Sequence, residues 1–271
     1  MNKLYCYNNI LYITIDNQIE KTALIEIDLT TFDYKVHYIE QGQLDCNIET
    51  HTRSNSYLYQ NILYQIKGCE KGIILNLSNI FSDSTLASFF IDRYKEISFK
   101  NTPFIQNGSY WILNKKEEKE LENVDKALKR ILTDKIGISA YNYNDTIELT
   151  IGGHGQIKLS GGSGGMMMSP GMAPISGGSG GMMMSPGMAP TLHNYSSYTS
   201  TRSVYFKSMI DKNYYHIEGE VPQNVFEKIK DFLKDYEGKI SAKTIFKMND
   251  YYILGYYLTD QEKYILRKFV K

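Results

Sequence analysis

Cysteine, tryptophan and net charge are all scarce in this sequence. Its three cysteines, Cys6, Cys46 and Cys69, include no closely spaced pair. This spacing predicts reduced thiols and argues against both a disulfide framework and a zinc knuckle. The 30 basic residues balance the 30 acidic residues, which removes the usual electrostatic argument for a nucleic-acid partner. No motif indicates a cofactor, and we expect none.

Long apolar runs are also missing. The first residues, MNKLYCYNN, contain no apolar run of signal-peptide length. Elsewhere no apolar stretch approaches the roughly 18 residues that cross a bilayer. We therefore expect a cytoplasmic protein without a membrane span. The 271 residues suffice for one large or two modest domains.

Methionine, by contrast, is concentrated in one place. Residues 159–190 read LSGGSGGMMMSPGMAP and then ISGGSGGMMMSPGMAP, so one unit is written twice with a single difference. This methionine repeat contains eight of the eleven methionines, namely Met166, Met167, Met168, Met172, Met182, Met183, Met184 and Met188. It divides the chain into an N-terminal domain (1–158), a Gly/Ser/Met/Pro linker (159–194) and a C-terminal domain (195–271).

The composition of the methionine repeat is compatible with three roles. Gly-Gly-Ser-Gly-Gly is highly flexible, and the Pro-Gly and Ala-Pro steps oppose both helix and strand. Methionine side chains adapt to irregular apolar surfaces. The repeat can therefore be a plain spacer, a docking segment that packs on a partner protein or on another copy of the chain, or a Cu(I) site made of thioethers. We favour docking, because eight exposed methionines would promote aggregation if nothing covered them.

Short alternating segments predict strands joined by tight turns. Residues 3–40 are typical of a β-meander, in which Asn8-Asn9 accepts the positive φ of a two-residue hairpin turn. Gly72–Leu77 is a short apolar strand of the kind that is buried on both faces. Further hairpins are expected at Asn107-Gly108, between Tyr143 and Thr146, around Asp211–Asn213, and at Asn249-Asp250.

Apolar residues three and four positions apart predict five helices. They are expected over 54–67, from Asp83 to Ile97, over 117–132, over 225–236, and from Thr259 towards the C-terminal residues. The expected fold class is therefore α+β, with mainly antiparallel sheets built from β-hairpins and amphipathic helices on one face, in ββα units. The C-terminal domain would then have the order ββαββα.

One segment resembles a known family. Gly72–Ile97 reads GIILNLSNIFSDSTLASFFIDRYKEI, an apolar strand ending in Asn-Leu, then Asp83-Ser84-Thr85, then an Arg-Tyr-Lys run. It resembles the central strand, loop and helix of STAS domains of the anti-sigma-factor antagonist type. The resemblance implies a regulatory module that is switched by phosphorylation at Ser84 or Thr85.

One group of side chains is a candidate metal site. If 214–221 is a strand, His216, Glu218 and Glu220 lie two apart and project from one face. A histidine beside two carboxylates can bind a divalent metal ion or perform acid–base catalysis. The same alternation is also typical of a solvent-facing strand, which is the simpler interpretation.

The function we expect is non-enzymatic. The methionine repeat would dock on a protein partner or on another copy of the chain, and the two folded domains would position it. Two alternatives stay open: a STAS-like regulatory module phosphorylated at Ser84 or Thr85, and a metal-assisted enzyme that uses His216, Glu218 and Glu220.

Overall fold

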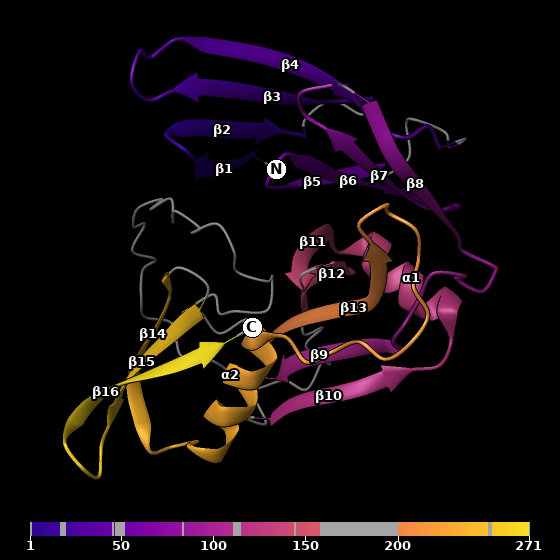
Figure 1. Ribbon diagram of the computed structural model, residues 1–271. Coiled ribbons are helices and arrows are strands. Elements are labelled where there is room, and N and C mark those ends of the chain that lie inside the picture. The colour runs from indigo at the N-terminus through magenta and orange to yellow at the C-terminus, as the bar shows by residue number, and fades with distance from the viewer. Residues whose placement is uncertain are drawn as a thin grey trace, which may run out of the picture.

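The computed structural model of the protein describes residues 2–16, 20–44, 46, 52–82, 84–110, 115–143, 145–157, 200–248 and 251–270. These residues form sixteen strands and two helices, and the strands pair antiparallel in four sheets (Figure 1). The expected α+β class is therefore wrong, and the described part of the chain is a β-rich fold. Neither helix in this part has the length and apolar character needed to cross a membrane.

The first sheet is the predicted meander, with strand order β1-β2-β3-β4. Its strands are β1 (Asn2–Tyr7), β2 (Ile10–Ile15), β3 (Lys21–Asp28) and β4 (Tyr34–Glu40). Asn8 and Asn9 have φ angles of 48° and 65°, the left-handed backbone that a two-residue hairpin turn requires. The prediction for residues 3–40 is thus confirmed.

The second sheet has the order β5-β6-β7-β8 and replaces two predicted helices. Its strands are β5 (Arg53–Tyr59), β6 (Ile62–Cys69), β7 (Gly72–Asn79) and β8 (Ser84–Asp92). The segment 54–67 is a hairpin that turns at Gln60, where φ is 55°. Ile62 and Ile66 lie four apart, and this even spacing suits one face of a strand as well as one side of a helix. The apolar strand predicted at Gly72–Leu77 is confirmed as part of β7.

The third sheet has five strands in the order β10-β9-β13-β12-β11. Its strands are β9 (Phe104–Tyr110), β10 (Lys115–Leu121), β11 (Lys135–Tyr143), β12 (Thr146–Ile157) and β13 (Ser200–Asp211). The predicted helix over 117–132 is only partly correct, because the chain first forms β10 and then α1 (Val124–Thr133). The hairpin between Tyr143 and Thr146 is confirmed, whereas Asn107-Gly108 lies inside β9 and makes no turn there.

Glycines in β12 allow α1 to pack directly on the strand backbone. A Cβ atom on Gly153 would lie 2.7 Å from the carbonyl oxygen of Ile131 in α1, and one on Gly155 would overlap the Asp134 carboxylate. A larger residue at either position would push the helix away. Gly152–Gly155 is therefore a strand segment that lies under a helix.

The fourth sheet has the order β14-β15-β16 and is covered on one face by a helix. Its elements are α2 (Val225–Asp235), β14 (Ile240–Met248), β15 (Tyr251–Leu258) and β16 (Lys263–Val270). The helix predicted over 225–236 and the hairpin of β14 with β15 are confirmed. The final predicted helix is wrong, because Ile265 and Phe269 face α2 from a strand that pairs with β15.

A buried charge network fixes α2 to the five-stranded sheet. The Lys207 ammonium lies 3.1 Å from the Glu148 carboxylate and 2.5 Å from that of Glu227 in α2. Asn224 caps the helix by accepting hydrogen bonds from the backbone N–H groups of Phe226 and Glu227, and its amide donates to Glu148 at 3.1 Å. Pairing and capping together satisfy groups that would be costly to bury alone.

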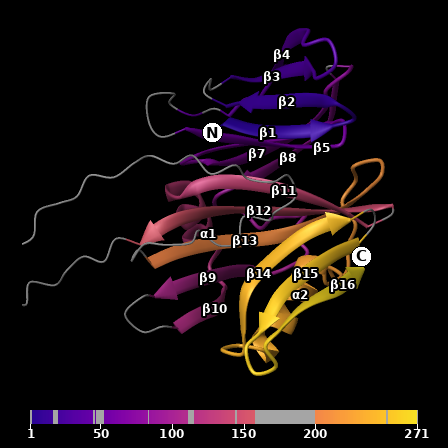
Figure 2. The same ribbon diagram turned by 90° about the vertical axis from the view of Figure 1, so that its left-hand side faces the viewer.

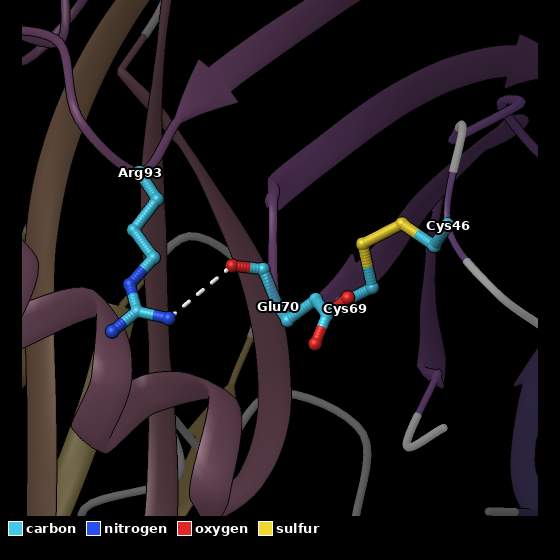
Figure 3. The surroundings of a disulfide bond; sticks show 4 residues. All are labelled: Cys46, Cys69, Glu70 and Arg93. Atoms are coloured by element: carbon cyan, nitrogen blue, oxygen red, sulfur yellow. Dashed lines mark hydrogen bonds between the residues drawn. A yellow bond between two sulfur atoms is a disulfide. The ribbon is translucent and has the colours of Figure 1, made fainter.

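A disulfide joins Cys46 to Cys69 (Figure 3). Cys46 lies in the connection between the first and second sheets, and Cys69 is the buried last residue of β6. The expected reduced state is therefore wrong for this pair, whereas Cys6 is a free, exposed cysteine. The pairing was not predicted because 23 positions separate the two cysteines, and only the fold brings them together.

The chain beyond this disulfide is held to α1. The Glu70 carbonyl accepts a hydrogen bond from Arg93 at 3.3 Å (Figure 3). The same guanidinium contacts the carboxylate of Asp125, in the first turn of α1, at 2.5 Å. The second sheet is thereby tied to the third through one arginine.

The sheets are arranged from one end of the molecule to the other. Figures 1 and 2 show β1–β4 at the top, β5–β8 below them, and β14–β16 towards the bottom, level with β9 and β10 of the third sheet. Buried side chains of β5–β8 pack on the first sheet through Leu58 and Leu63, and on the third through Ile66 and Leu75. The second sheet is thus covered on both faces, whereas the first and the fourth each have one covered face.

Candidate interaction surface

The methionine repeat, predicted to be the docking segment, lies outside the described residues. This holds for all eight of its methionines, Met166, Met167, Met168, Met172, Met182, Met183, Met184 and Met188. Docking by the repeat therefore stays a prediction.

The predicted phosphorylation site begins a strand. Ser84 and Thr85 are exposed, and the Ser84 hydroxyl lies 2.7 Å from that of Ser82. Thr85 pairs with Ser78 across β7 and β8. The STAS resemblance requires a helix from this point, and the observed strand removes that structural basis. Phosphorylation at Ser84 or Thr85 stays an untested prediction.

His216, Glu218 and Glu220 do not lie on a common strand face. Residue 216 makes an isolated bridge with Ile210, and Glu218 and Glu220 follow in an irregular, exposed segment. The His216 ring nitrogen Nε2 lies 3.0 Å from the side-chain oxygen of Asn101. In the part of the chain that is described, no group of three His, Cys, Asp or Glu side chains could hold a metal ion.

A small pocket lies beside His216. Its volume is about 260 Å³, which is below the usual size of ligand pockets. It is lined by Leu86, Ala87, Ser88, Phe89, Asn213, Tyr214, Tyr215 and His216. No buried carboxylate or second histidine accompanies His216 there, so the pocket contains no recognisable acid–base pair.

The inner face of the first sheet is closed by aromatic side chains. Tyr5 packs edge to face against Tyr57 of the second sheet, with ring centroids 6.0 Å apart, and stacks on Tyr7 at 6.4 Å. The Tyr7 hydroxyl donates to the Leu58 carbonyl at 3.2 Å. Burial raises the pKa of Tyr5 and raises that of Tyr7 to about 12. These rings exclude water from the contact between the two sheets.

A buried polar group closes one end of the same inner face. The Asp16 carboxylate accepts hydrogen bonds from the hydroxyls of Thr22 and Ser56, both at 2.9 Å. Lys3 donates to the Ser56 carbonyl. Burial lowers the pKa of Lys3 to about 8, and the nearby Asp16 charge opposes that shift. These polar side chains are hydrogen-bonded within the contact between the two sheets, and they do not lie on the opposite face of the first sheet.

The opposite face of the first sheet is almost entirely apolar. Hydrogen-bonded pairing aligns its side chains in three rows across the four strands. The rows are Leu4, Ile13, Ile25 and Val36; Cys6, Leu11, Ile27 and Tyr34; and Asn2, Ile15, Ala23 and Tyr38. We call this surface the N-terminal outer face.

Nothing in the described residues covers the N-terminal outer face. None of its side chains is fully buried, and none belongs to a buried hydrophobic cluster. Val36 is 42% exposed and Tyr34 is 71% exposed, whereas Leu24 on the inner face is fully buried. Four strands at about 4.8 Å by six residues at about 3.3 Å give a footprint of about 400 Å². This is the size of the largest apolar patch on a typical monomer, which often has a function.

The fourth sheet has a similar uncovered surface on the side away from α2. Its rows across β14, β15 and β16 are Met248, Tyr251 and Val270; Phe246, Ile253 and Lys268; Thr244, Gly255 and Leu266; and Ser241, Tyr257 and Tyr264. We call it the C-terminal outer face. Leu266 is 61% exposed. The Lys268 ammonium lies 4.2 Å from the Tyr251 ring centroid, so its charge rests on an aromatic ring.

Comparison with known proteins identifies no family. No family model matches the chain, and no curated protein matches it. Among solved structures, a GH43 endo-arabinanase from Bacillus licheniformis aligns over 98% of this chain and 92% of its own, with 9% identity and a TM-score of 0.25. A TM-score this low supports no conclusion about fold or activity.

The two outer faces were not predicted as sites, although one had a signal in the sequence. Strand β2 reads ILYITI and is apolar at both odd and even positions. Such a strand is typical of a sheet that is covered on both sides. The C-terminal outer face had no such signal, because the pattern of β16 was interpreted as a helix.

Proposed function

We propose that this protein is a non-enzymatic assembly protein that docks on other protein through its N-terminal outer face. One observation carries the proposal: three rows of almost exclusively apolar side chains, uncovered by any described residue, on a sheet whose other face is closed. Covering this surface removes about 400 Å² of apolar footprint from water, which favours association through the hydrophobic effect.

The methionine repeat is a second contact element in this proposal. Its flexible glycine segments supply reach, and its methionines adapt to an apolar partner surface. Deletion of 160–190 would then weaken association without changing the folded domains. The proposed partner is another protein or a second copy of this chain, and we propose no nucleic-acid partner.

A cytoplasmic location was expected from the sequence and stays a prediction. The Cys46–Cys69 disulfide argues against it, because disulfides rarely persist in a reducing cytosol.

Replacement of Val36 by lysine tests the docking surface. Val36 lies in the central row of the N-terminal outer face and is exposed, so the variant is expected to fold. A charge there must be desolvated on docking, which opposes association. We expect concentration-dependent association of the wild type in sedimentation velocity, its loss in Val36→Lys, and reduced fluorescence of the apolar dye ANS with the dilute variant.

Ser98→Lys is the matched control, because Ser98 is exposed and lies outside both sheets that carry an outer face. It should keep the wild-type mass and dye binding. Tyr34→Lys, on the same face as Val36, is the second variant should Val36→Lys fail to fold. If neither lysine on the face changes mass or dye fluorescence, the N-terminal outer face is not a docking surface.

A further inference from the structure

We infer that the N-terminal outer face of one molecule packs against the C-terminal outer face of a second copy. The inference rests on the proposed function and names the partner. It explains both uncovered faces with one contact, because each chain carries one face of each kind. Figures 1 and 2 show the two sheets towards opposite ends of the molecule, which suits a contact between copies.

The two faces match in size and character. Three strands at about 4.8 Å by eight residues at about 3.3 Å give the C-terminal outer face a footprint of about 380 Å², close to that of its proposed partner. The N-terminal face is mainly aliphatic, and the C-terminal face presents aromatic rings at Phe246, Tyr251, Tyr257 and Tyr264. Stacked sheets bury such surfaces against each other at a spacing of about 10 Å.

The segments that carry the two faces have net charges of opposite sign, although most of their charged side chains lie off the outer faces themselves. Residues 2–40 contain six acidic and three basic residues, whereas residues 239–271 contain seven basic and three acidic residues. Pairing unlike faces therefore brings a segment of net negative charge to one of net positive charge. Pairing either segment with its own copy brings together net charges of the same sign, which disfavours a symmetric dimer.

The charged residues on the two sheets also favour a contact between unlike faces. On the N-terminal sheet, Lys21 and Glu40 pair at 2.9 Å beyond the three apolar rows. On the C-terminal sheet, Lys268 is the charged residue of the four rows. A symmetric pairing of the C-terminal faces would bring two copies of this ammonium close together, whereas the N-terminal face offers it no cation.

A contact between unlike faces has a defined consequence for assembly. After a first contact one copy keeps a free C-terminal outer face and the other keeps a free N-terminal outer face, so further copies add until a ring closes or the chain continues. The buried area is at the low end for specific interfaces, so association should be weak and concentration-dependent. Because opposite charges orient the contact, high salt should weaken it.

Mixing two blocked variants tests this inference. Val36→Lys blocks the N-terminal outer face, and Leu266→Glu blocks the C-terminal outer face with a charge that the acidic sheet repels. Each variant alone should sediment as a monomer at concentrations where the wild type associates. An equimolar mixture should associate again, because it contains one intact face of each kind. Ser98→Glu is the control and should behave as the wild type.

Other outcomes overturn the inference and separate it from the proposed function. If only Val36→Lys loses association and the mixture does not restore it, the N-terminal faces pair with themselves. If only Leu266→Glu loses it, the C-terminal faces pair with themselves. If the wild type is a monomer throughout while Val36→Lys still reduces ANS fluorescence, the docking surface stands but its occupant is the methionine repeat or a different protein.

Discussion

Tyrosines determine how the contact between the first two sheets responds to pH. Tyr5, Tyr7 and Tyr57 lie in or beside this contact, and burial raises the pKa of each hydroxyl. Folding therefore holds these side chains in their neutral form. Because ionised tyrosine is disfavoured there, alkaline conditions weaken the attachment of the first sheet.

At the residue scale, Tyr7→Phe should flatten the alkaline loss of stability. The folded pKa of Tyr7 is raised to about 12, whereas the unfolded value is about 10. Its contribution is fully present below about pH 10 and is lost as the pH rises through about 12. Urea denaturation at increasing alkaline pH should therefore show a steeper fall in the free energy of unfolding for the wild type than for Tyr7→Phe.

Tyr94→Phe provides the control for this measurement, since Tyr94 is 77% exposed. Its profile should follow that of the wild type. Parallel profiles for Tyr7→Phe and the wild type would show that this hydroxyl is not protected by the contact.

Helix α2 illustrates what the sequence could predict at the scale of one element. Apolar residues recur at helical spacing, and Asn224 with Glu227 forms a capping box at its start. Spacing alone did not decide the outcome, because Leu86, Phe89 and Phe90 are also three and four apart and belong to strand β8. Ile62 with Ile66, and Ile265 with Phe269, lie four apart, and both pairs belong to strands as well. At such positions, only strand pairing with distant segments of the chain distinguishes a strand from a helix.

The Asn224→Ala variant should lower the free energy of unfolding by about 1 to 2 kcal/mol. The substitution removes the acceptor for two backbone N–H groups at the start of α2. It also removes a donor to the buried Glu148 carboxylate. The loss is measured by chemical denaturation followed by far-ultraviolet circular dichroism.

The matched variant is Asn123→Ala. Asn123 caps α1 through Lys126, is more exposed, and touches no buried carboxylate. We expect a smaller loss of stability there. An equal loss in the two variants would show that the contact with Glu148 contributes nothing beyond the cap.

For the whole molecule, the sequence predicted strands and the turns between consecutive strands better than the order of the sheets. Local turn residues such as Asn8 and Asn9 act within a few positions. By contrast, β13 pairs with both β12 and β9, across segments far apart in the chain. The N-terminal outer face was predictable as an apolar strand pattern, but its exposure depends on what the other sheets leave uncovered.

Loss of the Cys46–Cys69 disulfide should lower the free energy of unfolding by about 3 kcal/mol. Closing a loop of 23 positions restricts the unfolded chain by about this amount. Cys46→Ser and the wild type under reducing conditions should show the same decrease in chemical denaturation. Cys6→Ser should show none, and three free thiols in the oxidised, purified protein would contradict the pairing.

The uncovered apolar face of β1–β4 has a consequence during biosynthesis. This meander is completed by residue 40, whereas the strands that close its inner face come later in the chain. During synthesis, the N-terminal outer face and the tyrosine-containing inner face of this sheet are therefore both exposed until those strands follow. Chaperones that bind exposed apolar segments would meet β1–β4 before the strands that cover its inner face are made.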